Sequence, residues 1–189
     1  MRILGAALIS EGILWILSTL ILWALDGELI WNISFSTGVT GILLAAPPLC
    51  LNMYLWSRAV AAPNSVYGRF SREIITPLCR QISIPTAVSV AILSGWCEEY
   101  FFRGALSVAL THYVGAVLSC VVSSLLFAAI HFIGSFKRFG AMLPLYTVMG
   151  IYMWLVHLLS GSLFCVAVLH GAYNLAAILH VKLRERRCA

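Results

Sequence analysis

The sequence predicts an all-α protein, a polytopic bundle of about six transmembrane helices. Two observations carry this prediction. Of the 189 residues, 61% are hydrophobic and only 10% are charged, whereas a soluble domain carries about 25% charged residues. The apolar residues also form continuous runs of roughly 20 residues, the length that crosses a bilayer. Runs without alternation indicate helices, because the backbone must satisfy its own hydrogen bonds in lipid. Residues 1–189 therefore form a single membrane domain.

The first apolar run predicts a helix near residues 3–25. It resembles a secretory signal, but it contains Glu11 and continues to an acidic turn at Asp26 without a small-residue cleavage site, so we expect a retained helix. A second helix is expected near 38–57, with a kink at Pro47 and Pro48.

A polar connection and four further helices follow. Residues 58–83 contain four arginines and two prolines, which indicate a long polar connection whose tail lies along the membrane interface. The remaining apolar runs predict helices near 84–109, 114–133, 142–159 and 162–181.

The positions of Lys and Arg predict the orientation. Six spans bring both termini to one side, and eleven of the twelve cations fall on that side. Since basic loops remain in the cytoplasm, we expect cytoplasmic N- and C-termini. Only Arg103 is expected near the opposite side, which also receives Asp26 and Glu28. The net charge of +5 is explained by this orientation, so no nucleic-acid partner is expected.

Ionisable residues interrupt the apolar runs at Glu98, Glu99, His131 and His170. An ionised side chain at bilayer depth costs on the order of 3 kcal/mol or more, so such residues usually face a polar cavity and mark a functional site. Glu99 and Arg103 are four residues apart and can form an ion pair on one helix face. Glu98 is rotated by about 100° and points elsewhere. His170 and Asn174 are also one turn apart.

These residue types suffice for hydrolysis by an activated water molecule. Glu98 could act as the general base, with His131 holding the water. His170 and Asn174 could donate hydrogen bonds to an oxyanion, where one donor is typically worth about 3 kcal/mol. Helix rise places Glu98 and His170 each about 18 Å from the cytoplasmic ends of their helices, but His131 only about 9 Å. Its helix must therefore be tilted or extend past Gly134.

The ordered motifs EExxxR, FxxxH and HxxxN resemble the CPBP family of glutamic-type intramembrane proteases, which includes the type II CAAX prenyl endopeptidases and the bacterial ABI proteins. The resemblance covers residues 84–181, a catalytic four-helix core, and leaves residues 1–83 as an accessory part. It implies catalytic roles for Glu98, His131, His170 and Asn174, and supporting roles for Glu99, Arg103 and Phe127. It implies neither a metal ion nor a cofactor.

The resemblance also implies a membrane-anchored protein or peptide as the substrate. It allows prenylated CAAX tails, bacteriocin or pheromone precursors, regulatory membrane proteins, and C-terminal sorting anchors of the myxosortase or JDVT-CTERM kind. The small size favours a prokaryotic member in the bacterial inner membrane, with a maturation or sorting role. The sequence leaves the oligomeric state open.

Two alternatives stay open on the residues alone. A zinc ion could lie between Glu98, His131 and His170, since two imidazoles and a carboxylate make a plausible catalytic set. The polar cluster could instead stabilise a non-catalytic scaffold or immunity protein. Glu11 has no obvious partner. The six cysteines lack ligand-like spacing and are expected to be small buried hydrophobes. The other histidines lie near helix ends and are expected at the interface: His112, His157 and His180.

Overall fold

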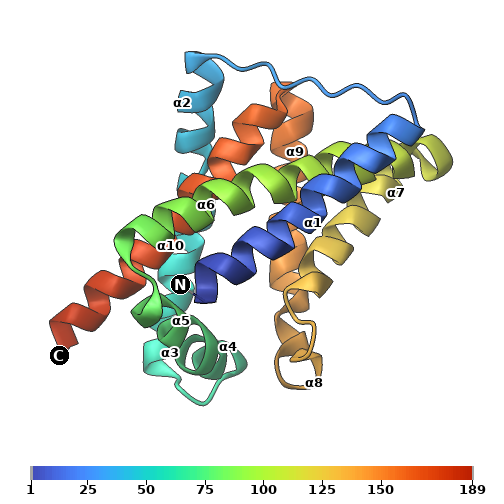
Figure 1. Cartoon of the computed structure of the whole chain (residues 1–189). Coiled ribbons are helices and arrows are strands. Elements are labelled where there is room, and N and C mark those ends of the chain that lie inside the picture. The colour runs from blue at the N-terminus through green and yellow to red at the C-terminus, as the bar shows by residue number, and fades with distance from the viewer. Residues whose placement is uncertain (1, 189) are drawn as a thin grey trace.

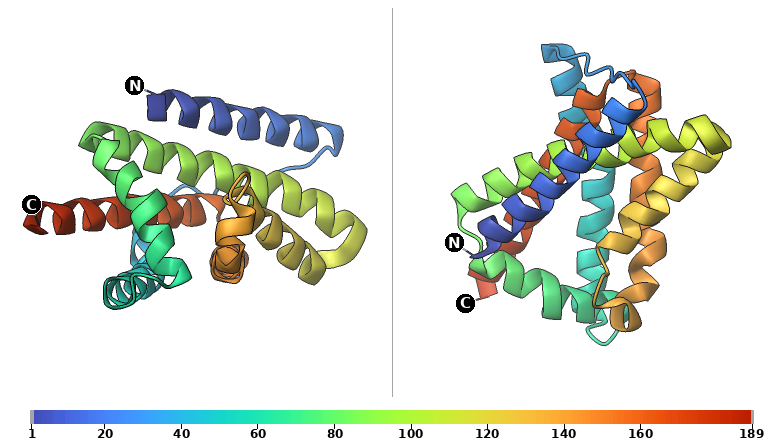
Figure 2. Two further views of the ribbon diagram at one scale, coloured as in Figure 1. Left: turned by 90° about the horizontal axis from the view of Figure 1, so that it is seen from below. Right: turned by 45° about the vertical axis from the view of Figure 1, so that its right-hand side comes forward.

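The computed structural model describes residues 2–188 of the chain, and the side chains of residues 3–185. All secondary structure in this part is helical (Figure 1). Five segments are long and apolar enough to cross a membrane, and one of them, Ile84–Ile130, has 47 residues. This segment bends at Gly115, where φ is 78° and ψ is 165°, and its two arms diverge as a V (Figure 2). The predicted polytopic helical bundle is confirmed.

The first two spans agree closely with the sequence prediction. They consist of α1 (Arg2–Ala24), α2 (Phe35–Leu44) and α3 (Ala46–Ala61). The second span is interrupted at Ala45, directly before the two prolines. Proline is tolerated in the first turn of a helix because the amide hydrogen it lacks has no helical partner there. The chain therefore starts a new helix at the point where the sequence predicted a kink.

The connection over residues 58–83 is more regular than expected. It forms α4 (Val66–Phe70), a π-helical turn η1 (Ser71–Ile75) and α5 (Thr76–Gln81). These elements run crosswise to α3 at one end of the bundle (Figure 2). The Lys182 Nζ on the last helix donates hydrogen bonds to the carbonyl oxygens of Cys79 and Ile82, at 2.8 and 2.6 Å. The crosswise segment is thereby fastened to the bundle.

The remaining elements include four long helices over the region expected to hold four spans. They are α6 (Ile84–Glu99), the π-helical η2 (Tyr100–Ala105), α7 (Leu106–Ile130), α8 (Phe136–Phe139), the 3-10 turn η3 (Gly140–Met142), α9 (Leu143–Ser160) and α10 (Leu163–Cys188). α7 ends at Ile130, and Gly134 has a φ of 80°. The possible extension of this helix past Gly134 is therefore wrong. The final helix continues beyond the expected residue 181.

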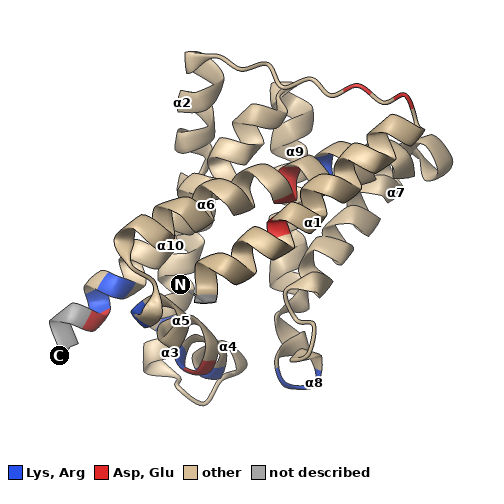
Figure 3. Ribbon diagram, in the orientation of Figure 1, with Lys and Arg blue, Asp and Glu red and all other residues tan. Residues whose placement is uncertain are grey.

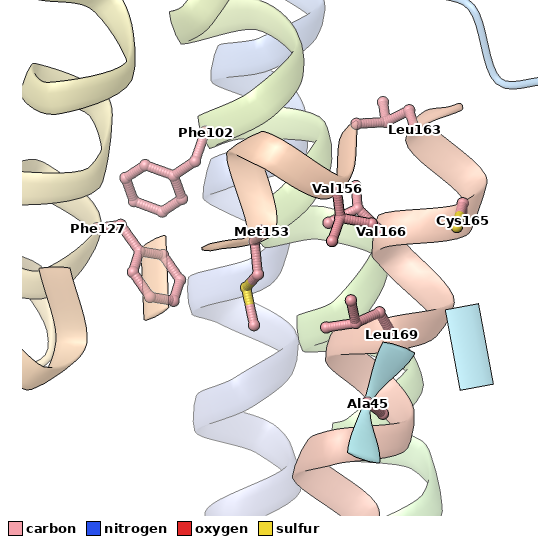
Figure 4. Close-up of a cluster of buried hydrophobic side chains, with 9 residues drawn as sticks. All are labelled: Ala45, Phe102, Phe127, Met153, Val156, Leu163, Cys165, Val166 and Leu169. Carbon is pink, nitrogen blue, oxygen red and sulfur yellow. The ribbon is translucent and has the colours of Figure 1, made fainter. Parts of the chain in front are cut away.

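Close contact between α6 and α10 sets the position of the site. A Cβ added to Gly95 would lie 2.6 Å from the carbonyl oxygen of Ala167, and one added to Gly171 would lie 2.9 Å from that of Ala91. Small residues of this kind let helix backbones approach each other in membranes. Beside this contact, apolar side chains from η2, α7, α9 and α10 form a buried cluster (Figure 4).

Basic residues gather at one end of the bundle, where Glu73 and Glu185 pair with two of them (Figure 3). Blue Lys and Arg segments gather at the end that also holds the first turn of α1, and the loop with Asp26 and Glu28 lies at the other end. The separation predicted from the sequence is present, while its assignment to the cytoplasm stays a prediction. Arg103, the one cation expected near the opposite side, lies inside the bundle. Its side chain is only 1% exposed because it pairs with a carboxylate inside the bundle.

Candidate active site

A buried ionic network lies where α6, η2 and α10 meet. Oε1 of Glu99 accepts a hydrogen bond from Arg103 Nη1 at 2.9 Å and another from His170 Nδ1 at 2.7 Å. These side chains are 0%, 1% and 3% exposed. The Glu99–Arg103 ion pair predicted from the four-residue spacing is confirmed. The network joins a residue of the first motif to a residue of the third.

Arg103 extends this network to two more helices. Its Nη2 donates to the carbonyl oxygen of Gly150 on α9 at 2.9 Å. Its guanidinium carbon lies 4.5 Å from the centre of the Phe127 ring on α7, within the range of a cation–π interaction. Arg103 itself lies within the π-helical turn η2, a feature frequent at functional sites. The guanidinium therefore fixes the relative positions of the elements that carry all three motifs.

The bond to Glu99 determines what His170 can do. Because a carboxylate only accepts, the hydrogen of this bond belongs to His170 Nδ1. Nε2 is then the ring nitrogen available to a ligand. It accepts a hydrogen bond in the neutral ring and donates one when the ring is doubly protonated.

Asn174 is held by a residue that the motif does not contain. Its Nδ2 donates to the hydroxyl oxygen of Ser94 on α6 at 2.9 Å. A primary amide has two hydrogens, so one donor remains for another partner. Ser94 was missed by the sequence analysis. The available signal was its position one turn before Glu98, on a helix that carries the first motif.

The FxxxH motif is a single local unit. His131 Nδ1 lies 2.7 Å from the carbonyl oxygen of Phe127, one turn earlier. The His131 ring centre lies 4.9 Å from that of Phe127 and 5.0 Å from that of Tyr146. Phe127 also contacts His170, with 5.9 Å between ring centres. The aromatic residue of the motif thus separates and orients the two histidines.

A cavity of about 290 Å³ lies against these residues. His131, His170 and Asn174 line it together with Phe127. The rest of its wall is mostly apolar and comes from α3, the crosswise segment, α9 and α10. These residues include Leu51, Leu55, Trp56, Leu78, Met149, Ala177, Ile178 and Val181. The cavity therefore extends from the polar motif residues along an apolar path.

Two further polar side chains, Tyr67 and Asn52, also line the cavity. The Tyr67 hydroxyl on α4 donates to Asn52 Oδ1 on α3 at 3.1 Å. Burial raises the pKa of Tyr67 above its ordinary value. The phenol consequently keeps its proton at neutral pH. It can donate to Asn52 but carries no charge into the cavity.

Glu98 occupies a different position from the other three predicted catalytic residues. It is half-buried and is not part of the cavity wall, and its Oε2 is buried with no hydrogen-bond partner in the described part of the chain. The structure therefore brings His131, His170 and Asn174 to one cavity and leaves Glu98 beside it.

The zinc alternative is not assembled in this arrangement. Among the residues that the structure describes, no three His, Cys, Asp or Glu side chains lie close enough to hold a metal ion together. His170 uses Nδ1 for Glu99, and His131 uses Nδ1 for a backbone carbonyl. The three remaining histidines lie outside the cavity wall: His112, His157 and His180.

Comparison with known proteins extends these observations. The searches of curated proteins and of solved structures gave no match. A sequence model of the family described as type II CAAX prenyl endopeptidase Rce1-like matches residues 80–176, which is half of the chain and contains every residue of the three motifs. The chain therefore belongs to this Rce1-like family within the CPBP proteins, and it is an integral membrane protein of an intramembrane protease family.

Proposed function

We propose that the protein is a glutamic-type intramembrane endopeptidase that hydrolyses a peptide bond of a membrane-anchored protein or peptide. One observation carries the proposal. The buried Glu99–Arg103–His170 network lies beside a cavity that also receives His131 and Asn174. Removing these charged groups from water costs free energy. Ionisable residues inside a membrane usually mark a functional site.

The proposed reaction uses each motif for one task. The Glu98 carboxylate removes a proton from a water molecule that His131 helps to hold, and the water oxygen attacks the carbonyl carbon of the substrate. A C–O bond forms, and the carbonyl oxygen becomes an oxyanion. The C–N bond then breaks, and the leaving nitrogen takes the proton from Glu98. The products are a carboxylic acid and an amine, as hydrolysis requires.

His170 and Asn174 supply the oxyanion donors in this scheme. Asn174 has a second amide hydrogen beyond the one that binds Ser94. His170 can donate from Nε2 only as the doubly protonated ring, and the Glu99 carboxylate at 2.7 Å stabilises that form. Each donor is expected to contribute about 3 kcal/mol to the transition state. Glu99, Arg103 and Phe127 hold the ring in position.

The apolar wall of the cavity supports a substrate with an apolar segment next to the cleaved bond. We propose maturation or C-terminal sorting of such a substrate in a bacterial inner membrane. The basic end of the bundle supports an orientation with that end in the cytoplasm. The cavity reaches Leu78 and Val181, towards this same end.

The test compares cells that carry the wild type with cells that carry Glu98→Gln, His170→Ala or Asn174→Ala. Mass spectrometry identifies the membrane-protein termini that form only with the wild type. Glu28→Gln, in the exposed loop before α2, is the matched control.

We expect the wild-type termini to disappear in all three variants and to remain in Glu28→Gln. A zinc chelator should leave them unchanged, and their loss with chelator would favour the zinc alternative instead. Termini that persist in Glu98→Gln would refute the glutamic mechanism. If no terminus differs from an empty-vector strain, the scaffold alternative replaces the enzyme.

A further inference from the structure

An acidic residue in α1 lies outside the matched family region and has no role in the mechanism above. Glu11 is only 8% exposed, whereas its neighbours Ile9, Ile13 and Ile16 are 68%, 53% and 59% exposed. The helix therefore directs one carboxyl inward and presents an apolar surface outward. Oε2 of Glu11 is buried with no hydrogen-bond partner in the part of the chain that the structure describes.

Glu11 faces the helix that carries the proposed catalytic base. α1 packs against α6 and η2, and the acidic segments of α1 and α6 lie at similar depth (Figure 3). The charges of Glu98 and His170 both act on the Glu11 carboxyl, and those of Glu11 and Glu98 both act on Cys97. Glu98 also has one buried oxygen without a hydrogen-bond partner among the residues that the structure describes. Two packed helices thus each carry a carboxyl group with a buried oxygen that has no hydrogen-bond partner among the described residues.

The cations nearby are already engaged. Arg103 on η2 donates to Glu99 and to a backbone carbonyl, and His170 on α10 donates to Glu99. Two carboxylates that remain unneutralised in a region of low dielectric repel each other strongly. Such pairs commonly hold a single proton between them, which removes the repulsion and satisfies an oxygen on each side. A buried unsatisfied group of this kind requires an explanation, and a shared proton provides one.

We propose that Glu11 is a positioning residue of the active site, whose carboxyl group holds one proton together with Glu98 and thereby orients the Glu98 carboxylate towards the substrate. The inference rests on the proposed function. The shared proton is not consumed, because the proton removed from water passes through Glu98 to the leaving nitrogen. α1, which the sequence assigned to the accessory part, then contributes a residue to the site.

Glu11→Gln tests this role, because it removes the shared proton and keeps the shape of the side chain. Glu11→Asp is the conservative variant. Ser18→Ala is the matched control, since Ser18 is another buried polar residue of α1 whose hydroxyl bonds the carbonyl oxygen of Leu14 on its own helix.

The first readout is the rate at which the wild-type-specific termini accumulate in cells with equal amounts of folded protein. We expect at least a tenfold decrease in Glu11→Gln, since a general base that loses its orientation loses part of an effect worth about 10²–10⁴ in rate. Glu11→Asp should retain more activity than Glu11→Gln. Ser18→Ala should match the wild type.

The second readout does not depend on the substrate. Infrared spectra of the purified protein at neutral pH should contain the carbonyl stretch of a protonated carboxyl group in the wild type and in Ser18→Ala. The band should be lost in Glu11→Gln.

The outcomes distinguish the inference from the function on which it rests. If Glu98→Gln abolishes cleavage while Glu11→Gln cleaves like the wild type and leaves the band unchanged, only the inference is overturned. If Glu98→Gln still cleaves, the proposed mechanism fails. A loss of activity in Glu11→Gln with an unchanged infrared band would assign Glu11 a packing role and would also overturn the inference.

Discussion

Removal of Arg103 should destabilise the bundle far more than a surface substitution. Arg103→Met keeps an unbranched stem but loses the bonds to Glu99 and Gly150 and the contact over Phe127. Glu99 stays fully buried with His170 as its remaining partner. Breaking a buried ion pair by removing one partner costs about 3–5 kcal/mol, and a desolvated cation–π contact adds up to about 2 kcal/mol. We expect a loss of about 4 kcal/mol in the free energy of unfolding.

The assay is reversible unfolding in mixed detergent micelles, followed by the loss of helical signal. Arg103→Lys is the matched control. It keeps the charge but not the planar fork that reaches two acceptors, so its loss should be intermediate. The double variant Glu99→Gln with Arg103→Met should recover part of the loss, because it leaves no uncompensated buried charge. A loss below about 1 kcal/mol in Arg103→Met would refute the view that this network holds the motifs together.

Three further experiments test the site and the helix packing that supports it. Asn174→Ala should slow cleavage by about 100-fold, because it removes one oxyanion donor. Ser94→Ala should slow cleavage less, because the Asn174 amide is still present. Initial rates on the identified substrate measure both effects, and equal losses would contradict this prediction. Gly95→Ala should destabilise the bundle by about 1–3 kcal/mol in unfolding titrations, because the added Cβ would lie 2.6 Å from a backbone oxygen of α10. Gly12→Ala is the control and should not destabilise the bundle, because its added Cβ would meet no atom of a neighbouring element within 4 Å in the described part of the chain. Lys182→Met should speed hydrogen exchange over residues 66–81, and unchanged exchange would show that its two bonds to backbone carbonyls do not fasten that segment.

The helical architecture was predictable because lipid leaves the chain few options. Continuous apolar runs specified the spans, and Pro47 and Gly115 lie where the helices are interrupted or bent. The crosswise segment over 66–81 was not foreseen as helical. It mixes charged and apolar residues and contains Pro77, but Pro77 occupies the first turn of α5 and therefore does not interrupt it.

Spacing along one helix predicted local pairs well and predicted contacts between helices poorly. The four-residue separation gave the Glu99–Arg103 pair, which the structure contains. It could not show that His170 bonds the same oxygen of Glu99, because that contact depends on how closely α6 and α10 approach. The approach is set by backbone packing at Gly95 and Gly171, two residues that carry no polar chemistry of their own.

The position of Glu98 follows from the same geometry. Adjacent residues of a helix point about 100° apart, so when Glu99 turns towards α10, Glu98 turns towards the neighbouring side of α6. α1 packs on α6, and it carries a second buried carboxyl, Glu11, which we propose shares a proton with Glu98. A residue inside an apolar run of the expected accessory part therefore acquires a partner only through the tertiary fold. The sequence showed that Glu11 is an acidic residue in an apolar run without an obvious partner. Only the packing of α1 on α6 points to Glu98 as that partner.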